Sequence, residues 1–183
     1  MNVSLNRLSS ALQNALETAE TIRVTGTVQG VGFRPTVYRL ANACGLRGEV
    51  LNDGEGVLIR ATGTRANLDQ FVQQLQVECP PLARIETIVR LPLDEPILAQ
   101  EFRIAESIHS PTHTQISPDA AICPACVADT LDPFSRWYRY PFTNCTHCGP
   151  RLSIIRAIPY DRRNTSMAAF PLCDECAQVY GDV

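Results

Sequence analysis

Apolar and polar residues alternate over residues 21–28, and this period of two predicts a β-strand. One face of the strand would turn toward a core and the other toward polar surroundings. The residues on the predicted core face are Ile22, Val24, Gly26 and Val28. Further strand patterns occur at 46–52, 56–62, 83–92 and 101–105. The chain up to residue 106 is therefore predicted to be rich in short strands.

Two stretches between these strands follow a helical period instead. The first covers residues 35–44, and the second begins at a cap, Thr64 or Asn67. The second helix is predicted to end before the Cys-Pro-Pro run at 79–81, since the residue before a proline disfavours helix. Cys44 follows the apolar period of the first helix, so we interpret it as a small core residue rather than a reactive thiol.

The order strand, helix, strand, strand, helix, strand resembles the split β-α-β unit of ferredoxin-like folds. We therefore predict an α+β fold of βαββαβ order for residues 21–106, with an antiparallel sheet and both helices on one face. The turn at 52–55 (Asn-Asp-Gly-Glu) suits a hairpin between the second and third strands.

Two polar or marginal segments flank this domain. Residues 1–20 carry leucines at helical spacing, and they form either a short amphipathic helix or a frayed extension. Residues 107–121 are polar and interrupted by proline, which is typical of a linker. His109 and His113 lie in that linker, and we interpret them as solvated side chains rather than metal ligands.

The composition is that of a globular protein, with 45% hydrophobic and 19% charged residues among 183. A net charge of −3 gives no general attraction to nucleic acid or to an anionic membrane. No apolar run approaches the roughly 20 residues that span a bilayer. The first 20 residues lack the features of a secretory signal, so a cytoplasmic location is expected.

Six of the eight cysteines form three Cys-x-x-Cys pairs within residues 122–183. Cys123 and Cys126 are followed after 18 residues by Cys145 and Cys148, a spacing expected for a structural four-cysteine zinc site. A redox-active pair is the competing interpretation, but two matched pairs favour metal. His147 lies between two of these cysteines, which do not need it as a ligand.

The third pair, Cys173 and Cys176, lies 50 residues after the first. An acidic residue follows the second cysteine of both pairs at six positions, as Asp132 and Asp182, which is a faint internal repeat. A matching closing pair would fall beyond Val183, so we expect one complete zinc site and one half site.

A glycine-containing loop at residues 26–34 separates the first strand from the first helix. Gly30 and Gly32 permit backbone conformations in which several N–H groups turn inward together, and such a loop at a helix N-terminus favours an anion. Arg34 at its rim can grip a phosphate with two parallel hydrogen bonds. The alternative is a tight strand-to-helix turn without a ligand.

The loop also resembles the acylphosphatase signature, through the core Val28-Gln29-Gly30-Val31-Gly32-Phe33-Arg34. A second block agrees: residues 48–52 followed by glycines 56 and 63. The resemblance implies that Arg34 binds the phosphoryl group, together with the loop from Gln29 to Phe33, and that Asn52 positions the attacking water. Without this resemblance, Asn52 would be interpreted simply as a turn-forming residue. Glu49 and Leu51 depart from the family pattern, and we expect them to affect packing rather than catalysis.

Residues 138–151, 159–162 and 165–173 closely resemble the zinc-finger region of HypF, the carbamoyltransferase family of [NiFe]-hydrogenase maturation. This resemblance implies that the acylphosphatase domain acts on carbamoyl phosphate and that a HypE-like protein is the partner. The later nucleotide-binding and carbamoyl-transfer domains of that family are missing, so the chain resembles a truncated or split HypF. It is not expected to complete the transfer alone.

Two alternatives from other classes stay open. The first is a non-catalytic, zinc-containing interaction module. The second is nucleic-acid binding through the arginines of residues 134–163, where Trp137 and Tyr138 could stack on bases. The acidic overall charge makes the second alternative the weaker one.

Overall fold

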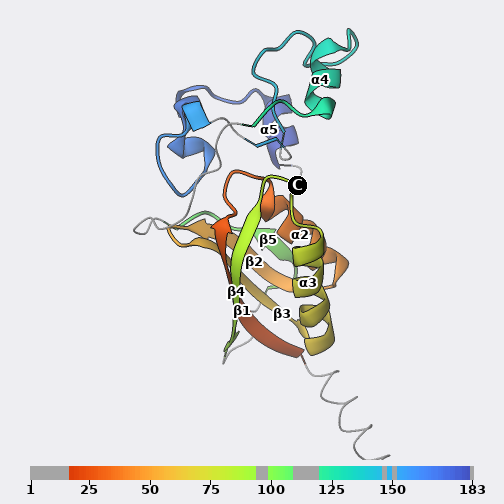
Figure 1. The fold of residues 1–183 in the computed structure, drawn as a ribbon, viewed down its shortest axis with the longest axis vertical. Coiled ribbons are helices and arrows are strands. Elements are labelled where there is room, and N and C mark those ends of the chain that lie inside the picture. The colour runs from red at the N-terminus through yellow and green to blue at the C-terminus, as the bar shows by residue number, and fades with distance from the viewer. Residues whose placement is uncertain (1–16, 94–98, 109–119, 146–147, 150–151, 182–183) are drawn as a thin grey trace, which may run out of the picture.

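The computed structural model describes residues 17–93, 99–108, 120–145, 148–149 and 152–181. Its first part is a five-stranded sheet of order β4-β1-β3-β2-β5. Helices α2 (Phe33–Ala43) and α3 (Arg65–Val77) lie against one side of the sheet (Figure 1). This arrangement confirms the predicted α+β, ferredoxin-like fold. The strands are β1 (Glu17–Thr27), β2 (Arg47–Asp53), β3 (Gly56–Thr64), β4 (Arg84–Leu93) and β5 (Phe102–Ile104).

The sheet differs from the predicted one at its β5 edge. Strand β1 pairs antiparallel with β3 and β4, and β2 pairs antiparallel with β3. Strand β5, however, runs parallel to β2, with Phe102 opposite Gly48 and Ile104 opposite Val50. The chain leaves β4 at one edge of the sheet and returns at the other edge, where it enters beside β2 in the same direction. The predicted antiparallel sheet is therefore confirmed for β1 to β4 and wrong for β5.

The first strand also begins earlier than the sequence pattern suggested. Residues 17–20 were predicted to belong to an N-terminal extension, but they are strand in the structure. Ala19 is only 6% exposed and lies opposite Thr62 and Leu93 in the sheet. Pairing with two neighbouring strands extends β1 past the point where its alternation becomes clear. The rest of that extension lies outside the described residues.

Both helices bury an apolar stripe on the sheet. For α3, the side chain of Thr64 accepts a hydrogen bond from the backbone N–H of Asn67 (3.2 Å), so Thr64 is the cap. Cys44 is 6% exposed and its thiol contacts the amide oxygen of Gln74 (3.3 Å); burial raises its pKa. Its predicted place in the core is confirmed. The central cluster comprises Ile22, Val24, Val37, Leu40, Val50, Ile59, Leu68, Phe71, Leu75 and Phe102, among others.

The second part of the chain lies beyond the end of the sheet at which α2 begins (Figure 1). It consists of short helices joined by long connections. Helices α4 (Pro124–Leu131) and α5 (Asp174–Gly181) each have eight residues and each follows the first cysteine of a pair. Three short 3-10 helices lie between them: η1 (Leu152–Ile154), η2 (Arg162–Asn164) and η3 (Ser166–Ala169). No described helix is both long enough and apolar enough to cross a membrane.

Candidate functional site

The loop between β1 and α2 takes the conformation that its glycines allow. Gly30 and Gly32 have φ angles of 72° and 75°, in the left-handed region that favours glycine. Gly32 is also the N-cap of α2, and its carbonyl accepts a hydrogen bond from the backbone N–H of Thr36 (3.2 Å). Between and after the glycines, Val31 and Phe33 are buried and anchor the loop in the core. The loop is thus a fixed turn, and helix α2 begins at its end.

Gln29 connects this loop to two other segments. Its amide nitrogen donates to the backbone carbonyls of Asp53 (2.7 Å) and Gly56 (2.8 Å), at the turn after β2. Its amide oxygen accepts from the backbone N–H of Tyr160 (3.1 Å), in the cysteine-rich part of the chain. The side chain is 2% exposed. Gln29 was predicted as a phosphate-binding position; its side chain acts here as a clamp between three segments.

Arg34 lies at the rim of the loop and faces the same segment. One terminal nitrogen, Nη2, donates to the Tyr160 carbonyl (3.2 Å) and to Oδ1 of Asp161 (2.9 Å). The other, Nη1, donates to the hydroxyl of Ser107 (3.3 Å). Ser107 is 7% exposed, so the start of the predicted linker is packed against the domain.

Asn52 lies near the end of β2, and its side chain donates to the same backbone carbonyl as Arg34, that of Tyr160. Its amide nitrogen donates to the Tyr160 carbonyl at 3.4 Å, and its side chain is buried. Its amide oxygen, Oδ1, is buried and accepts no hydrogen bond from the described part of the chain. A buried acceptor without a partner is costly, roughly 1–3 kcal/mol, so such an atom calls for an explanation such as a bound water or a catalytic role. The structure therefore brings the two predicted catalytic residues together.

The sequence pattern did not assign roles to Ser107, Tyr160 or Asp161. Asp161 lies 127 residues from Arg34 along the chain, and no periodicity links positions so far apart. The one available signal was the specific motif at 159–162, whose function was left open. The two family departures lie away from these contacts: Glu49 pairs with Arg60 (3.1 Å) and Arg103 (2.9 Å) on neighbouring strands, and Leu51 is buried.

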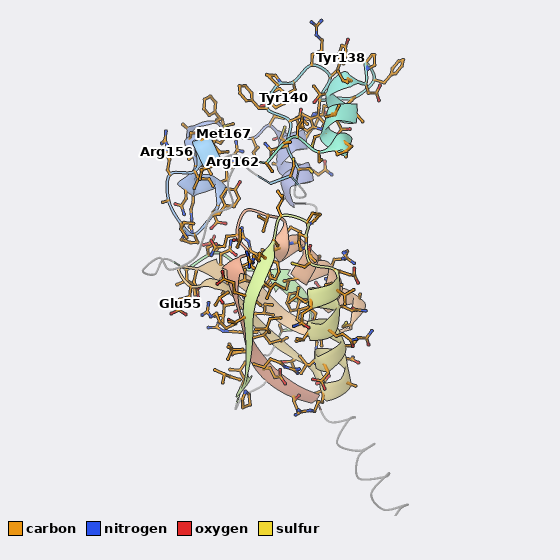
Figure 2. The ribbon with its side chains drawn as sticks, in the orientation of Figure 1. Glu55, Tyr138, Tyr140, Arg156, Arg162 and Met167 are labelled. Carbon is orange, nitrogen blue, oxygen red and sulfur yellow. The ribbon has the colours of Figure 1, made fainter. Side chains whose placement is uncertain are left out.

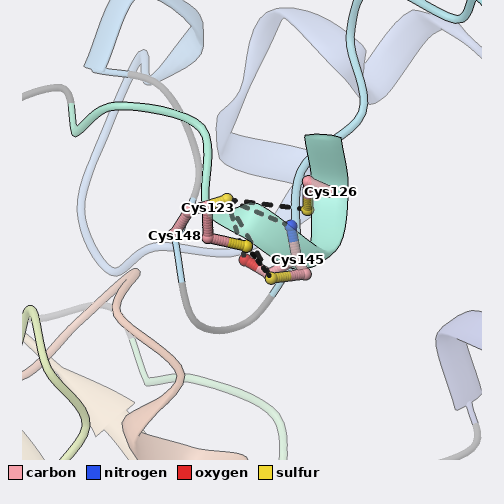
Figure 3. Close-up of side chains that lie close together, drawn as sticks. All are labelled: Cys123, Cys126, Cys145 and Cys148. Atoms are coloured by element: carbon pink, nitrogen blue, oxygen red, sulfur yellow. Dashed lines mark hydrogen bonds between the residues drawn. The ribbon is translucent and has the colours of Figure 1, made fainter. Parts of the chain in front are cut away.

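Four cysteines gather at the start of the second part, as Figure 3 shows. All four sulfur atoms lie within 4.8 Å of one another. The separation is 3.6 Å for Cys123 and Cys145, and 3.9 Å for Cys126 and Cys148. A tetrahedral zinc with Zn–S bonds of about 2.3 Å requires sulfur atoms about 3.8 Å apart. The cluster fits zinc in both chemistry and size.

The four thiols differ in their readiness to lose a proton. Burial, with hydrogen bonds to the neighbouring sulfurs, raises the pKa of the Cys126 thiol far above its usual range. Burial also acts on Cys148, but backbone hydrogen bonds at Cys145 and Cys123 outweigh it and lower its pKa to about 6. Because a zinc ligand is a thiolate, metal binding must displace the proton of Cys126.

Cys173 and Cys176 lie apart from this cluster. Arg136 approaches both sulfur atoms through Nη2, at 3.4 and 3.2 Å, and also pairs with Glu175 (3.1 Å). Among the residues that the structure describes, these two cysteines belong to no group of three or more ligands. Their half site therefore stays a prediction. His109, His113 and His147 lie outside the described residues.

Aromatic side chains and arginines are spread over the surface of this second part. Tyr138 and Tyr140 lie at its outer end near α4, away from the sheet (Figure 2). Arg162 donates to the carbonyl of Phe170 (2.7 Å), and Arg163 to that of Ser107 (3.1 Å). Arginines predicted as a possible nucleic-acid surface are thus partly engaged within the chain.

Comparisons with known proteins match both parts. Residues 20–104 match the acylphosphatase family and residues 122–155 the HypF finger. Carbamoyltransferase HypF of Rhodobacter capsulatus is 49% identical over 161 residues, 88% of this chain and 21% of that protein. An acylphosphatase of Latilactobacillus sakei subsp. sakei is 34% identical over 90 residues, 49% of this chain and 98% of that protein.

The fold agrees with these matches. The crystal structure of full-length HypF in the phosphate- and nucleotide-bound form gives a TM-score of 0.87 at 40% identity, over 91% of this chain and 22% of that one. This chain spans about a fifth of the length of the HypF relatives it matches. Since it covers nearly all of a free-standing acylphosphatase, the chain belongs to the acylphosphatase family, and with its HypF finger it corresponds to the N-terminal part of the HypF carbamoyltransferases.

Proposed function

We propose that this chain hydrolyses acyl phosphates, with carbamoyl phosphate as the substrate, at the site formed by the loop 29–34 and Asn52. The observation that carries the proposal is the buried Oδ1 of Asn52, which accepts no hydrogen bond from the described residues and lies beside Arg34 through their shared contact with the Tyr160 carbonyl. An acceptor in that position suits a water molecule, and a guanidinium suits the phosphoryl group that the water attacks.

The residues divide the reaction between them. The backbone N–H groups of the loop and Arg34 hold the phosphoryl oxygens and stabilise the charge that develops on them. Asn52 orients a water molecule through Oδ1. The water oxygen bonds to phosphorus while the bond between phosphorus and the acyl oxygen breaks. The products are inorganic phosphate and, from carbamoyl phosphate, carbamate. Most of the rate enhancement comes from positioning and electrostatics.

The wider role follows from the HypF relatives. We propose that the carbamate enters a carbamoyl transfer in [NiFe]-hydrogenase maturation, with a HypE-like protein as the final acceptor, and that other domains perform the later steps. Zinc at Cys123, Cys126, Cys145 and Cys148 has a structural role, because four protein ligands leave no open position for a substrate. Cys173 and Cys176 would supply two ligands to a second site.

The test is phosphate release from carbamoyl phosphate and acetyl phosphate by the purified chain and by Arg34→Ala. We expect kcat/KM to fall roughly a hundredfold or more, as when a group that stabilises transition-state charge is removed. Arg39→Ala is the matched control, since Arg39 lies on the same helix, is 59% exposed and pairs with Glu78. Full turnover in a folded Arg34→Ala protein would reject the site.

A non-catalytic interaction module is the second candidate. It is favoured by the exposed aromatic side chains of the second part, where Phe134 is 96% and Phe142 is 72% exposed. Where exposed apolar groups form one contiguous patch, the patch is typical of a surface that binds partners. The same assay separates the two functions: no phosphate release from either substrate by a folded, zinc-loaded chain would favour the binding module.

A further inference from the structure

The guanidinium of Arg34 already holds an anion. The two N–H bonds of its Nη2 atom point to Oδ1 of Asp161 (2.9 Å) and to the Tyr160 carbonyl (3.2 Å). The side chains of Arg34 and Asp161 are only 18% and 21% exposed, so water screens this pair incompletely. A carboxylate thus sits on the group proposed to bind the phosphoryl oxygens.

The backbone that carries Asp161 is held by contacts that do not involve its carboxylate. Gln29 accepts from the Tyr160 N–H (3.1 Å), and Asn52 donates to the Tyr160 carbonyl (3.4 Å). Arg163, two residues after Asp161, donates to the Ser107 carbonyl (3.1 Å). The segment would therefore stay in place when the Asp161 charge is removed or when its side chain rotates.

A phosphoryl group and the Asp161 carboxylate are both negative, and they cannot share the same N–H groups of Arg34. Resting on the proposed phosphate site, we propose that Asp161 is a placeholder for the phosphoryl group. Its carboxylate orients Arg34 while the site is empty, and it competes with substrate and product phosphate for the guanidinium.

Arg163 can pair with the Asp161 carboxylate when an anion displaces that carboxylate from Arg34. Nη2 of Arg163 lies 3.9 Å from Oδ2 of Asp161, whereas the hydrogen bond from Arg34 goes to Oδ1. When an anion takes Arg34, a rotation of the Asp161 side chain keeps its charge paired with Arg163. The exchange weakens phosphate binding without leaving a buried charge unpaired, and it speeds the release of product phosphate.

The test is the dissociation constant of inorganic phosphate for the whole zinc-loaded chain, measured by titration calorimetry. Asp161→Asn keeps the size of the side chain and removes its charge, so we expect phosphate to bind about tenfold more tightly. The KM for acetyl phosphate should fall in the same direction, with kcat changed much less. Asp161→Ala should shift phosphate binding in the same sense, which guards against an effect peculiar to the amide.

Asp69→Asn is the matched control. Asp69 also accepts a hydrogen bond from an arginine, Arg90, at 2.6 Å, but it lies on α3 at the far end of β1 from the loop. Phosphate affinity should not change in this variant. A change equal to that of Asp161→Asn would mean that net charge alone acts, and it would overturn the placeholder role.

The remaining outcomes separate this inference from the proposed function. Phosphate binding that needs Arg34 but is equal or weaker in Asp161→Asn overturns the placeholder and leaves the phosphate site standing. A loss of kcat with unchanged phosphate affinity also overturns it, because Asp161 would then act in the chemical step. Phosphate binding to neither wild type nor Asp161→Asn overturns both proposals.

Discussion

The nitrogen and the oxygen of the Asn52 side-chain amide have different surroundings. Its nitrogen donates to the Tyr160 carbonyl at 3.4 Å, whereas its buried oxygen receives no hydrogen bond from the described residues. Gln29 contrasts with it, because both ends of that amide have partners within the chain. An amide with both ends satisfied holds structure together, and one with a spare buried acceptor is suited to a ligand such as water.

This contrast gives a prediction for Asn52→Ala. We expect kcat for acetyl phosphate to fall roughly a hundredfold, because the attacking water loses its acceptor, while phosphate affinity stays within about twofold. Steady-state phosphate release and calorimetric titration measure the two effects. Asn42→Ala is the control, since Asn42 is exposed on α2 and its side-chain amide donates to the Tyr38 carbonyl (3.0 Å). Equal losses of kcat and of phosphate affinity would contradict the water-positioning role.

The loop and the finger region meet at two glycines. A Cβ at Gly149 would lie 2.4 Å from the carbonyl oxygen of Gly30, in the middle of the phosphate loop. Gly149 also has φ +65°, in the left-handed region. Only glycine allows both the conformation and the close approach of the two backbones. The position at which the finger region rests on the loop is therefore sensitive to a single methyl group.

We expect Gly149→Ala to destabilise the chain by more than the roughly 1–2 kcal/mol that the left-handed conformation alone costs an alanine. Gly45→Ala is the matched control, because Gly45 has φ +64° but its Cβ would meet nothing closer than 3.9 Å. Urea denaturation of the two variants compares the costs. Equal shifts would show that the loop and the finger region separate readily. Phosphate release should also fall in Gly149→Ala and stay near normal in Gly45→Ala.

Within the described residues, the first part of the molecule has one large hydrophobic core, and the second part has few buried apolar side chains. Every member of the core cluster lies between Ile22 and Phe102. Among the described residues after 120, the buried apolar side chains are those of Cys126, Cys148 and Pro159. So little buried apolar surface cannot order a region of this size, because fixing each residue costs about 1–2 kcal/mol of conformational entropy. Metal bonds at the cysteine cluster would supply the missing stability.

Removal of zinc by a strong chelator should therefore unfold the finger region and leave the sheet folded. Structural zinc contributes about 10–16 kcal/mol in small fingers at neutral pH. Thiol titration should show at least the four cluster cysteines become reactive, while buried Cys44 stays protected. Far-ultraviolet circular dichroism should keep the signal of the sheet and of α2 and α3. Four cluster thiols that react equally fast with and without chelator would contradict a structural metal.

Chelation should also lower phosphate release, because Tyr160 and Asp161 reach the site from the finger region. Ordered strands and lost activity together would indicate that the finger region completes the site. Unchanged activity after the finger region unfolds would show that the acylphosphatase domain works alone.

The sequence by itself determined the features that depend on neighbouring residues. Alternation located β1, the helical period located α2 and α3, and the glycine positions identified the loop, because backbone preferences act over a few residues. The two Cys-x-x-Cys turns identified the metal cluster for the same reason. Arg34 and Asn52 were named through a local motif, and their roles stay predictions until the variants are measured.

Only the tertiary structure decided which distant segments share the site. Ser107, Tyr160 and Asp161 meet Arg34 although 73 to 127 residues separate them along the chain. The parallel pairing of β5 with β2 and the close approach of Gly149 to Gly30 are of the same kind. Such contacts arise from how the two parts pack, and neither periodicity nor spacing encodes them. The loop could be found from the sequence, but the carboxylate that lies on its arginine could not.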